Sequence, residues 1–183
     1  MATKIRWITV LAMTILVLLV GVFSAAASPG LPPAAPMGPH EARPLAWGSG
    51  AAVPTAGWLM GGASVDGCTF YAIGGNTPGG GAVPNVDLYN PATDAWTSRA
   101  PMPMGLYGIQ PSAVGTRIYV VGGYADISTG LYAMTSTLIY DSGANSWSSG
   151  APIPVGDLGI GTAAQAAYNG KVYVMGGDDG DYN

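Results

Sequence analysis

Charged helix-forming residues are scarce in this chain. Only 9% of its 183 residues are charged, and Glu41 is the only glutamate. Because Glu, Lys and Arg are among the strong helix formers, we expect no helical domain. There is also a single histidine, His40, and a single cysteine, Cys68. An intramolecular disulfide is therefore excluded, and we expect no cofactor or metal centre that depends on imidazole.

Basic residues are too few for a nucleic-acid-binding surface. The chain has six Lys and Arg against ten Asp and Glu, which gives a net charge of −4. Nucleic-acid binding relies on clustered Lys and Arg, and like charges repel a polyanionic partner. We therefore expect no nucleic-acid partner.

The residues that are abundant favour short strands joined by tight turns. Hydrophobic residues make up 49% of the chain, with five Trp and ten Tyr, beside 29 Gly and 15 Pro. Aromatic residues fit strands, whereas Gly and Pro fit the turns between them. The composition therefore predicts an all-β fold.

The first 27 residues are typical of a signal peptide. Lys4 and Arg6 precede an apolar stretch over 7–23, and small residues follow at 24–28. This pattern predicts cleavage after Ala27 and a secreted location, either extracellular or periplasmic. The alternative is that 7–23 remains as a membrane anchor, and only then would a membrane be a partner.

A repeated pattern runs from residue 69 to residue 177. Three apolar runs end in a glycine pair, at 69–75, 117–123 and 171–177, and a turn dipeptide precedes each run. After the first two pairs, a Tyr is followed seven residues later by a Trp. The landmarks of the repeat are Gly74, Gly75, Tyr89, Trp96, Gly122, Gly123, Tyr140, Trp147, Gly176 and Gly177. We interpret the glycines as conformational and the aromatic residues as packing residues.

These landmarks, repeated at about 50 residues, resemble the kelch repeat. The likeness is to the kelch motifs of the galactose oxidase central domain, in a secreted bacterial type of protein. It implies four-stranded antiparallel blades of a β-propeller. The predicted fold class is all-β, an incomplete kelch-type β-propeller with two complete four-stranded blades and partial blades at each end. The predicted strands are 59–65, 69–74, 85–90, 95–99, 109–114, 117–122, 135–141, 146–149, 162–168 and 171–176.

The organisation that follows has six segments. They are a signal peptide (1–27), a Pro-rich linker (28–42), an outer strand of the closing blade (43–54), repeat 1 (55–103), repeat 2 (104–154) and a partial repeat 3 (155–183). A propeller needs four to eight blades, so this number is too small to close a ring. We expect a truncated or partial chain; assembly with other copies and an open array are the alternatives.

Kelch propellers include enzymes, so catalysis needs separate evidence. The resemblance to copper oxidases fails because the only histidine lies in the linker, and no catalytic position of a sialic-acid mutarotase can be carried over. Cys68 is expected to be incidental, since no histidine can activate it. The acidic residues Asp178, Asp179 and Asp181 lack the spacing of a calcium loop, and 76–82 lacks the Lys of a phosphate-binding loop.

The predicted function is a secreted or surface-located, non-catalytic binding or scaffolding module with an unknown protein or carbohydrate ligand. The alternative is the N-terminal part of a carbohydrate-active kelch enzyme, an oxidase or mutarotase. The candidate contact segment is the loop over 124–134, where Tyr124, Asp126 and Tyr132 could stack on a sugar and hydrogen-bond to it. Packing of these residues on a neighbouring blade is the competing interpretation.

Overall fold

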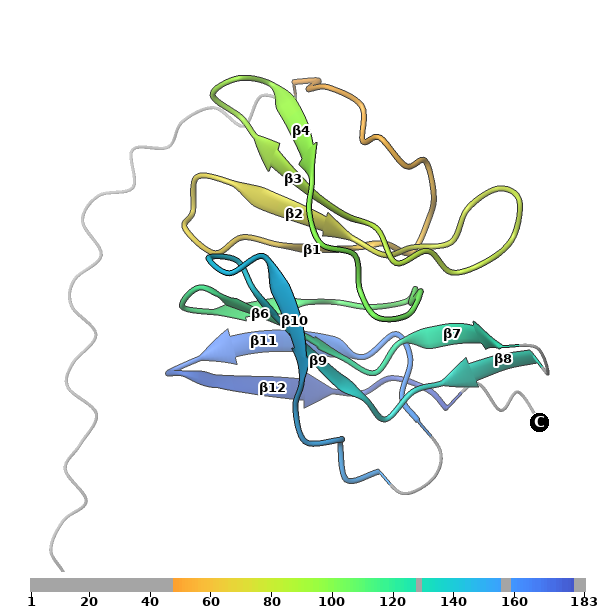
Figure 1. The fold of residues 1–183 in the computed structure, drawn as a ribbon. Coiled ribbons are helices and arrows are strands. Elements are labelled where there is room, and N and C mark those ends of the chain that lie inside the picture. The colour runs from red at the N-terminus through yellow and green to blue at the C-terminus, as the bar shows by residue number, and fades with distance from the viewer. Residues whose placement is uncertain (1–47, 128–129, 156–158, 180–183) are drawn as a thin grey trace, which may run out of the picture. The chain divides into compact units, whose positions relative to one another are not determined.

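The computed structural model describes residues 48–127, 130–155 and 159–179, and these residues form β-sheets (Figure 1). There are two four-stranded antiparallel sheets, here called blade 1 and blade 2, and a two-stranded sheet called unit 3. A further hairpin extends from blade 2. The predicted all-β class is confirmed, and the ten strands predicted between residues 59 and 176 are present, with bounds that differ by at most three residues.

Blade 1 is a simple meander. Its strands lie in the order β1-β2-β3-β4. The bounds are β1 (Gly61–Ala63), β2 (Phe70–Ile73), β3 (Val86–Asn90) and β4 (Ala95–Ser98). In the register of β3 and β4, Tyr89 pairs with Trp96, so two landmarks of the repeat are cross-strand neighbours.

Blade 2 repeats this meander with one insertion. Its strands lie in the order β10-β9-β6-β5. The bounds are β5 (Ser112–Val114), β6 (Arg117–Val121), β9 (Thr137–Asp141) and β10 (Ser146–Ser149). Between β6 and β9 the chain forms the hairpin β7 (Tyr124–Ile127) and β8 (Gly130–Ala133). The segment 124–134, predicted as the loop between the second and third strands of the blade, therefore contains a two-stranded hairpin: Tyr124 pairs with Ala133, and the two strands satisfy each other's backbone groups.

Unit 3 consists of β11 (Ala164–Tyr168) and β12 (Lys171–Met175), which pair antiparallel. Asn169 and Gly170 form the turn between them, and both have a positive φ, 50° and 73°. A two-residue hairpin turn of this kind favours Asn-Gly, which explains the sequence at this point.

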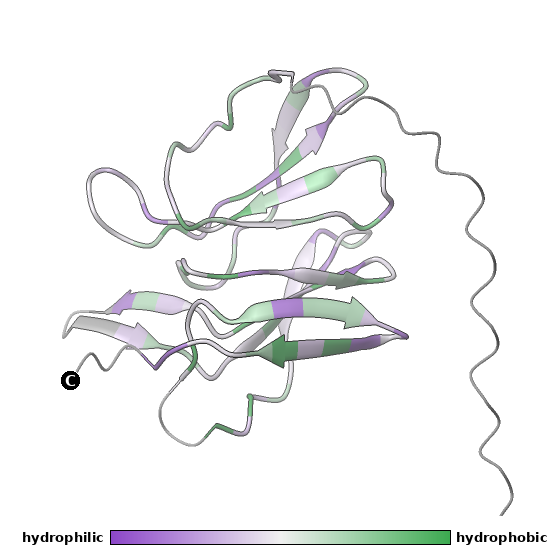
Figure 2. Cartoon of the chain, turned by 180° about the vertical axis from the view of Figure 1, so that it is seen from behind, coloured by the Kyte–Doolittle hydropathy of each residue, from purple (hydrophilic) through white to green (hydrophobic). Residues whose placement is uncertain are grey.

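The core lies where the faces of blades 1 and 2 meet. Tyr71 and Ile73 of β2 are buried, as are Ile118 and Val120 of β6 and Tyr140 of β9. The rings of Tyr71 and Tyr140 meet edge to face with centroids 5.7 Å apart. Apolar segments recur along the strands of each sheet (Figure 2). Tyr71 and Tyr140 are thus packing residues between blades 1 and 2.

Some predictions fall outside the described residues. These are the signal peptide, the linker with His40, Asp181 and residues 43–47 of the outer strand predicted over 43–54. Residues 48–54 are described, and they belong to no strand. Within the described ranges, no helix is long and apolar enough to cross a membrane.

Candidate functional site

Two backbone hydrogen bonds join blade 1 to blade 2, close to the glycine pair of blade 1. The N–H of Gly75 donates to the carbonyl of Leu106 at 2.9 Å. In return, the N–H of Gly108 donates to the carbonyl of Leu59, also at 2.9 Å. Each blade thus donates one bond and accepts one, and we call this pair of bonds the backbone clasp.

The same clasp joins blade 2 to unit 3. The N–H of Gly123 donates to the carbonyl of Ile160 at 2.8 Å, and the N–H of Thr162 donates to the carbonyl of Gly108 at 2.9 Å. Leu59, Gly108 and Thr162 hold equivalent places and all have a positive φ, between 52° and 61°. The three units therefore share the same backbone conformation at this position, as well as the sequence landmarks.

A cluster of side chains fixes each blade to the segment that precedes it. In blade 2 the Tyr140 hydroxyl donates to Oδ1 of Asn145 at 2.6 Å, and the Trp147 indole N–H donates to the Ala100 carbonyl at 2.9 Å. The Ala100 N–H donates to the same Asn145 oxygen at 2.9 Å. We call this group the Tyr140 cluster. Burial raises the pKa of the Tyr140 hydroxyl.

Blade 1 has the same arrangement in the Tyr89 cluster. The Tyr89 hydroxyl and the Ala51 N–H both donate to Oδ1 of Asp94, at 2.6 Å, and the Trp96 indole donates to the Ala51 carbonyl at 2.9 Å. The hydroxyl of Tyr89, followed by the N–H of Ala51, lowers the pKa of Asp94. The hydrogen bond to Asp94 raises the pKa of Tyr89.

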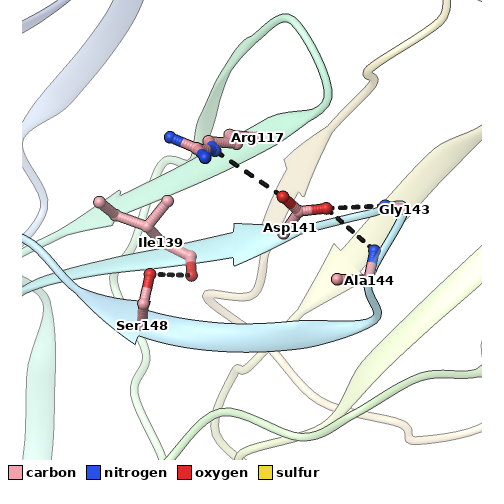
Figure 3. Close-up of polar contacts among 6 residues, drawn as sticks. All are labelled: Arg117, Ile139, Asp141, Gly143, Ala144 and Ser148. Carbon is pink, nitrogen blue, oxygen red and sulfur yellow. Dashed lines mark hydrogen bonds and ion pairs between the residues drawn. The ribbon is translucent and has the colours of Figure 1, made fainter.

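The turn after β9 shows how a short polar residue shapes this region. The carboxylate of Asp141 accepts the N–H groups of Gly143 and Ala144 at 3.0 and 2.9 Å (Figure 3). Its other oxygen lies 3.8 Å from Nε of Arg117. Because both side chains are well exposed, this ion pair contributes little to stability, and the turn itself is the main role of Asp141.

The segments that follow the glycine pairs gather on one side of the molecule, which we call the loop face. They are residues 76–84, the strands β7 and β8, and residues 178–179 (Figure 1). Binding residues are often carried by loops on a rigid scaffold, so this face is the candidate functional site.

The base of the hairpin is braced against both neighbours. The carboxylate of Asp126 accepts the N–H of Ala82 from blade 1 at 2.6 Å. On the other side, the Tyr124 hydroxyl donates to Asp178, which also accepts the Thr162 hydroxyl at 2.6 Å. The hairpin therefore has a fixed place between the two adjacent units.

These contacts separate the three predicted ligand-contact residues. Tyr124 is buried, contrary to the expectation of an exposed ring, because blade 2 and unit 3 enclose it. Asp126 is exposed and supports the loop of blade 1. Tyr132 lies on β8 and is 45% exposed. Of the three, Tyr132 has the position that suits a ligand contact.

A pocket of about 490 Å³ lies beside the backbone clasps, on the inner strands of all three units. Residues of its wall include Leu59, Gly62, Gly108, Gln110, Thr162 and Gln165. Among the residues that the structure describes, no charged side chain lines it. Gln165 donates from Nε2 to the Val121 carbonyl at 2.9 Å, and its buried Oε1 has no hydrogen-bond partner within the described residues. The wall suits uncharged groups that donate hydrogen bonds.

The remaining polar features have structural explanations. Asp66 accepts the N–H groups of Thr69 and Cys68 at 2.7 and 2.8 Å, and these bonds lower its pKa. Cys68 is an exposed free thiol in that turn. In the described part of the chain, no three His, Cys, Asp or Glu residues are placed to hold a metal ion.

Four-stranded meanders that repeat face to face through a common junction are the blades of a β-propeller. The family model of the kelch motif matches residues 59–103 and 107–154, a little over half of the chain. The chain therefore belongs to the kelch-motif family.

Individual relatives agree with this assignment. Human Kelch-like protein 25 is 31% identical over 120 residues, which cover 63% of this chain and 20% of that protein. Kelch-like protein terF of Aspergillus terreus is also 31% identical over 120 residues, covering 63% of this chain and 26% of the relative. The solved structure of YjhT aligns with a TM-score of 0.57 at 25% identity, covering 70% of this chain and 36% of that one. The chain thus spans a minor part of each relative.

Proposed function

We propose that this chain is an exported, non-catalytic kelch binding module that recognises a protein or carbohydrate ligand on its loop face. The observation that carries the proposal is the braced hairpin β7–β8. Asp126 and Tyr124 fix its base to both neighbouring units, while Tyr132 stays 45% exposed. A recognition element that is already held in place loses less conformational entropy on binding.

Tyr132 suits this role because a tyrosine offers a large contact area and a hydroxyl on only two rotatable bonds. Its ring can stack on a sugar or an apolar side chain. These features fit a glycan or an apolar protein segment.

Binding is tested by screening the purified chain on a glycan array and against a panel of extracellular proteins. For the ligand found, Tyr132→Ala is expected to weaken affinity at least tenfold, as for an aromatic anchor residue. The matched control is Tyr168→Ala, because Tyr168 is 65% exposed and lies beside the β11–β12 turn, away from the loop face. Equal losses in both variants would contradict the proposal. Turnover of a bound sugar would favour the enzyme alternative.

Export is tested separately, with the chain expressed under its own N-terminus. The mature protein is expected outside the cytoplasmic membrane, and N-terminal sequencing should begin at Ser28. A chain that keeps Met1 and stays with the membrane would show that 7–23 is an anchor. A chain that keeps Met1 in the cytoplasm would refute export.

A further inference from the structure

The turn between β11 and β12 differs chemically from the equivalent turns of the two blades. Gly67 and Gly115 stand at the positions of Asn169 in blades 1 and 2, at the same distance before the glycine pair. All three have a positive φ, of 71°, 59° and 50°. Only in unit 3 is this position an asparagine, and Gly170 follows it. The turn geometry accepts either residue type, so the asparagine adds a reactive amide without changing the fold.

The tip of this turn is exposed, and the exposure does not depend on what flanks the unit. Asn169 and Gly170 are exposed in unit 3. Blade 2 contacts blade 1 on one side and unit 3 on the other, yet Gly115 and Thr116 at the same turn are also exposed. A Cβ added to Gly115 would meet nothing within 4 Å. Water therefore reaches this turn even in a unit with two neighbours.

The side chain of Asn169 is the least restrained among the described asparagines. It makes no hydrogen bond with a described residue, and the N–H of Gly170 donates to none. The other described asparagines each hold a side-chain hydrogen bond. These bonds join Asn76 to the Gly81 N–H, Asn85 to the Thr55 hydroxyl, Asn90 to the Ala92 N–H, and Asn145 to the Tyr140 hydroxyl and the Ala100 N–H.

An unrestrained Asn-Gly pair contains both partners of an intramolecular reaction. The amide carbon Cγ of Asn169 is the electrophile, and the backbone nitrogen of Gly170 is the nucleophile. Because they belong to adjacent residues, their encounter needs no second molecule. Gly170 has no side chain to shield its nitrogen, and a Cβ at that position would meet nothing within 4 Å.

We propose that Asn169 is a site of spontaneous deamidation, selected by its exposed turn and its unrestrained side chain. The Gly170 nitrogen forms a bond to Cγ, the bond from Cγ to Nδ2 breaks, and Nδ2 leaves as ammonia with the proton of the Gly170 nitrogen. The product is a cyclic imide. Water then opens the imide at one of its two carbonyl groups, which gives either aspartate or isoaspartate. Ring closure requires the turn to open locally, as exposed hairpin ends do.

The two products change the turn in different ways. Both place a new carboxylate on an exposed surface. In isoaspartate the main chain also passes through the side-chain carbon, so the backbone of the turn becomes longer. Because a two-residue turn fixes the register of its hairpin, the longer backbone does not fit the pairing of Tyr168 with Lys171. Isoaspartate is therefore expected to loosen β11 from β12, beginning at the turn.

The test is to incubate the purified full chain in mildly alkaline buffer and to follow each asparagine by peptide mass spectrometry. An isoaspartate-specific methyltransferase detects the second product. Asn169 is expected to react about tenfold faster than any other described asparagine. Asn169→Gly, which carries the residue found at 67 and 115, should remove the isoaspartate signal. A wild-type chain that keeps its amide at 169, or an unchanged signal in this variant, would overturn the proposal.

A matched variant separates the structure from the dipeptide sequence. Asn145 has the same φ of 50° as Asn169, and Ser146→Gly gives it the same following residue. Its Oδ1 still accepts the Tyr140 hydroxyl and the Ala100 N–H, at 2.6 and 2.9 Å. In this variant Asn145 is expected to keep its amide while Asn169 reacts. Equal rates at the two positions would show that the restraint on the side chain has no influence, which contradicts the proposed selection of Asn169.

Discussion

The Tyr89 and Tyr140 clusters have nearly the same geometry in different surroundings. The hydroxyl-to-oxygen distance is 2.6 Å in both, the indole bond is 2.9 Å in both, and the Tyr and Trp ring centroids lie 4.9 and 5.1 Å apart. Tyr140 is fully buried between blades 1 and 2, whereas Tyr89 lies half-buried on the outward side of blade 1. The local sequence thus sets the geometry, and the neighbouring blade sets the burial.

This difference has energetic consequences. When a buried aromatic ring is removed, the fold loses the transfer free energy of that ring and is left with a cavity. When a partly exposed ring is removed, water fills the space, so the loss of stability is smaller. The two clusters also differ at one ionisable position, because Asp94 in blade 1 corresponds to Asn145 in blade 2. Burial and charge can therefore be tested separately within one molecule.

The largest expected effect comes from truncating the buried tyrosine. Tyr140→Ala should lower the free energy of unfolding by about 3–5 kcal/mol, because it opens a cavity against Tyr71 and Ile118. Tyr89→Ala should cost about 1–2 kcal/mol. Urea denaturation followed by tryptophan fluorescence measures both values. Equal losses would show that the local cluster, and not the blade junction, determines the contribution.

A smaller effect is expected at the glycine of the closed junction. Gly74→Ala should cost about 3 kcal/mol, since the new Cβ would meet the Leu106 carbonyl in addition to the strain of a positive φ. Gly67 is the control, because it has a φ of 71° and no atom near its Cβ position. Gly67→Ala should cost about 1 kcal/mol, from backbone strain alone. Similar losses in both variants would contradict a tight junction.

The strands were predictable from the sequence because each one is bounded by a local signal. Asn169-Gly170 is such a signal, and the glycine pairs that end β2 and β6 are others. The Asp and Asn of the two clusters also carried a signal that was missed. Asp94 and Asn145 each stand two residues before the Trp, both with a positive φ, which these residue types tolerate better than most.

The candidate site was less accessible to sequence reasoning because its contacts join different units. The burial of Tyr124 depends on Asp178 and on the ring of Tyr107, which are 54 and 17 positions away in the chain. The sequence pattern around residue 124 does not predict these contacts. Asp126 likewise supports a loop of blade 1, through Ala82. Sequence periodicity predicts a strand and its turns. The contacts that a side chain makes with another unit depend on the arrangement of the blades in space.

The smallest expected effect separates the charge in the Tyr89 cluster from its geometry. The hydroxyl of Tyr89 and the N–H of Ala51 hold the pKa of Asp94 below its usual value. A carboxyl with a lowered pKa in the folded state stabilises the fold above its unfolded pKa, near 4, and this stabilisation is lost as the pH falls through the folded pKa. Asp94→Asn should therefore flatten the dependence of the unfolding free energy on pH below about 4.

The reciprocal variant makes this comparison complete. Asn145→Asp places a carboxylate under the Tyr140 hydroxyl, and it should make the acid dependence steeper, since the same two kinds of donor face that position. Asp66, whose pKa is also lowered, accounts for part of the acid slope that both variants keep. Urea titrations between pH 2 and 7 measure the slopes. If Asp94→Asn leaves the acid slope unchanged, the carboxylate contributes no more than the amide that replaces it in blade 2, and the two clusters differ in burial alone.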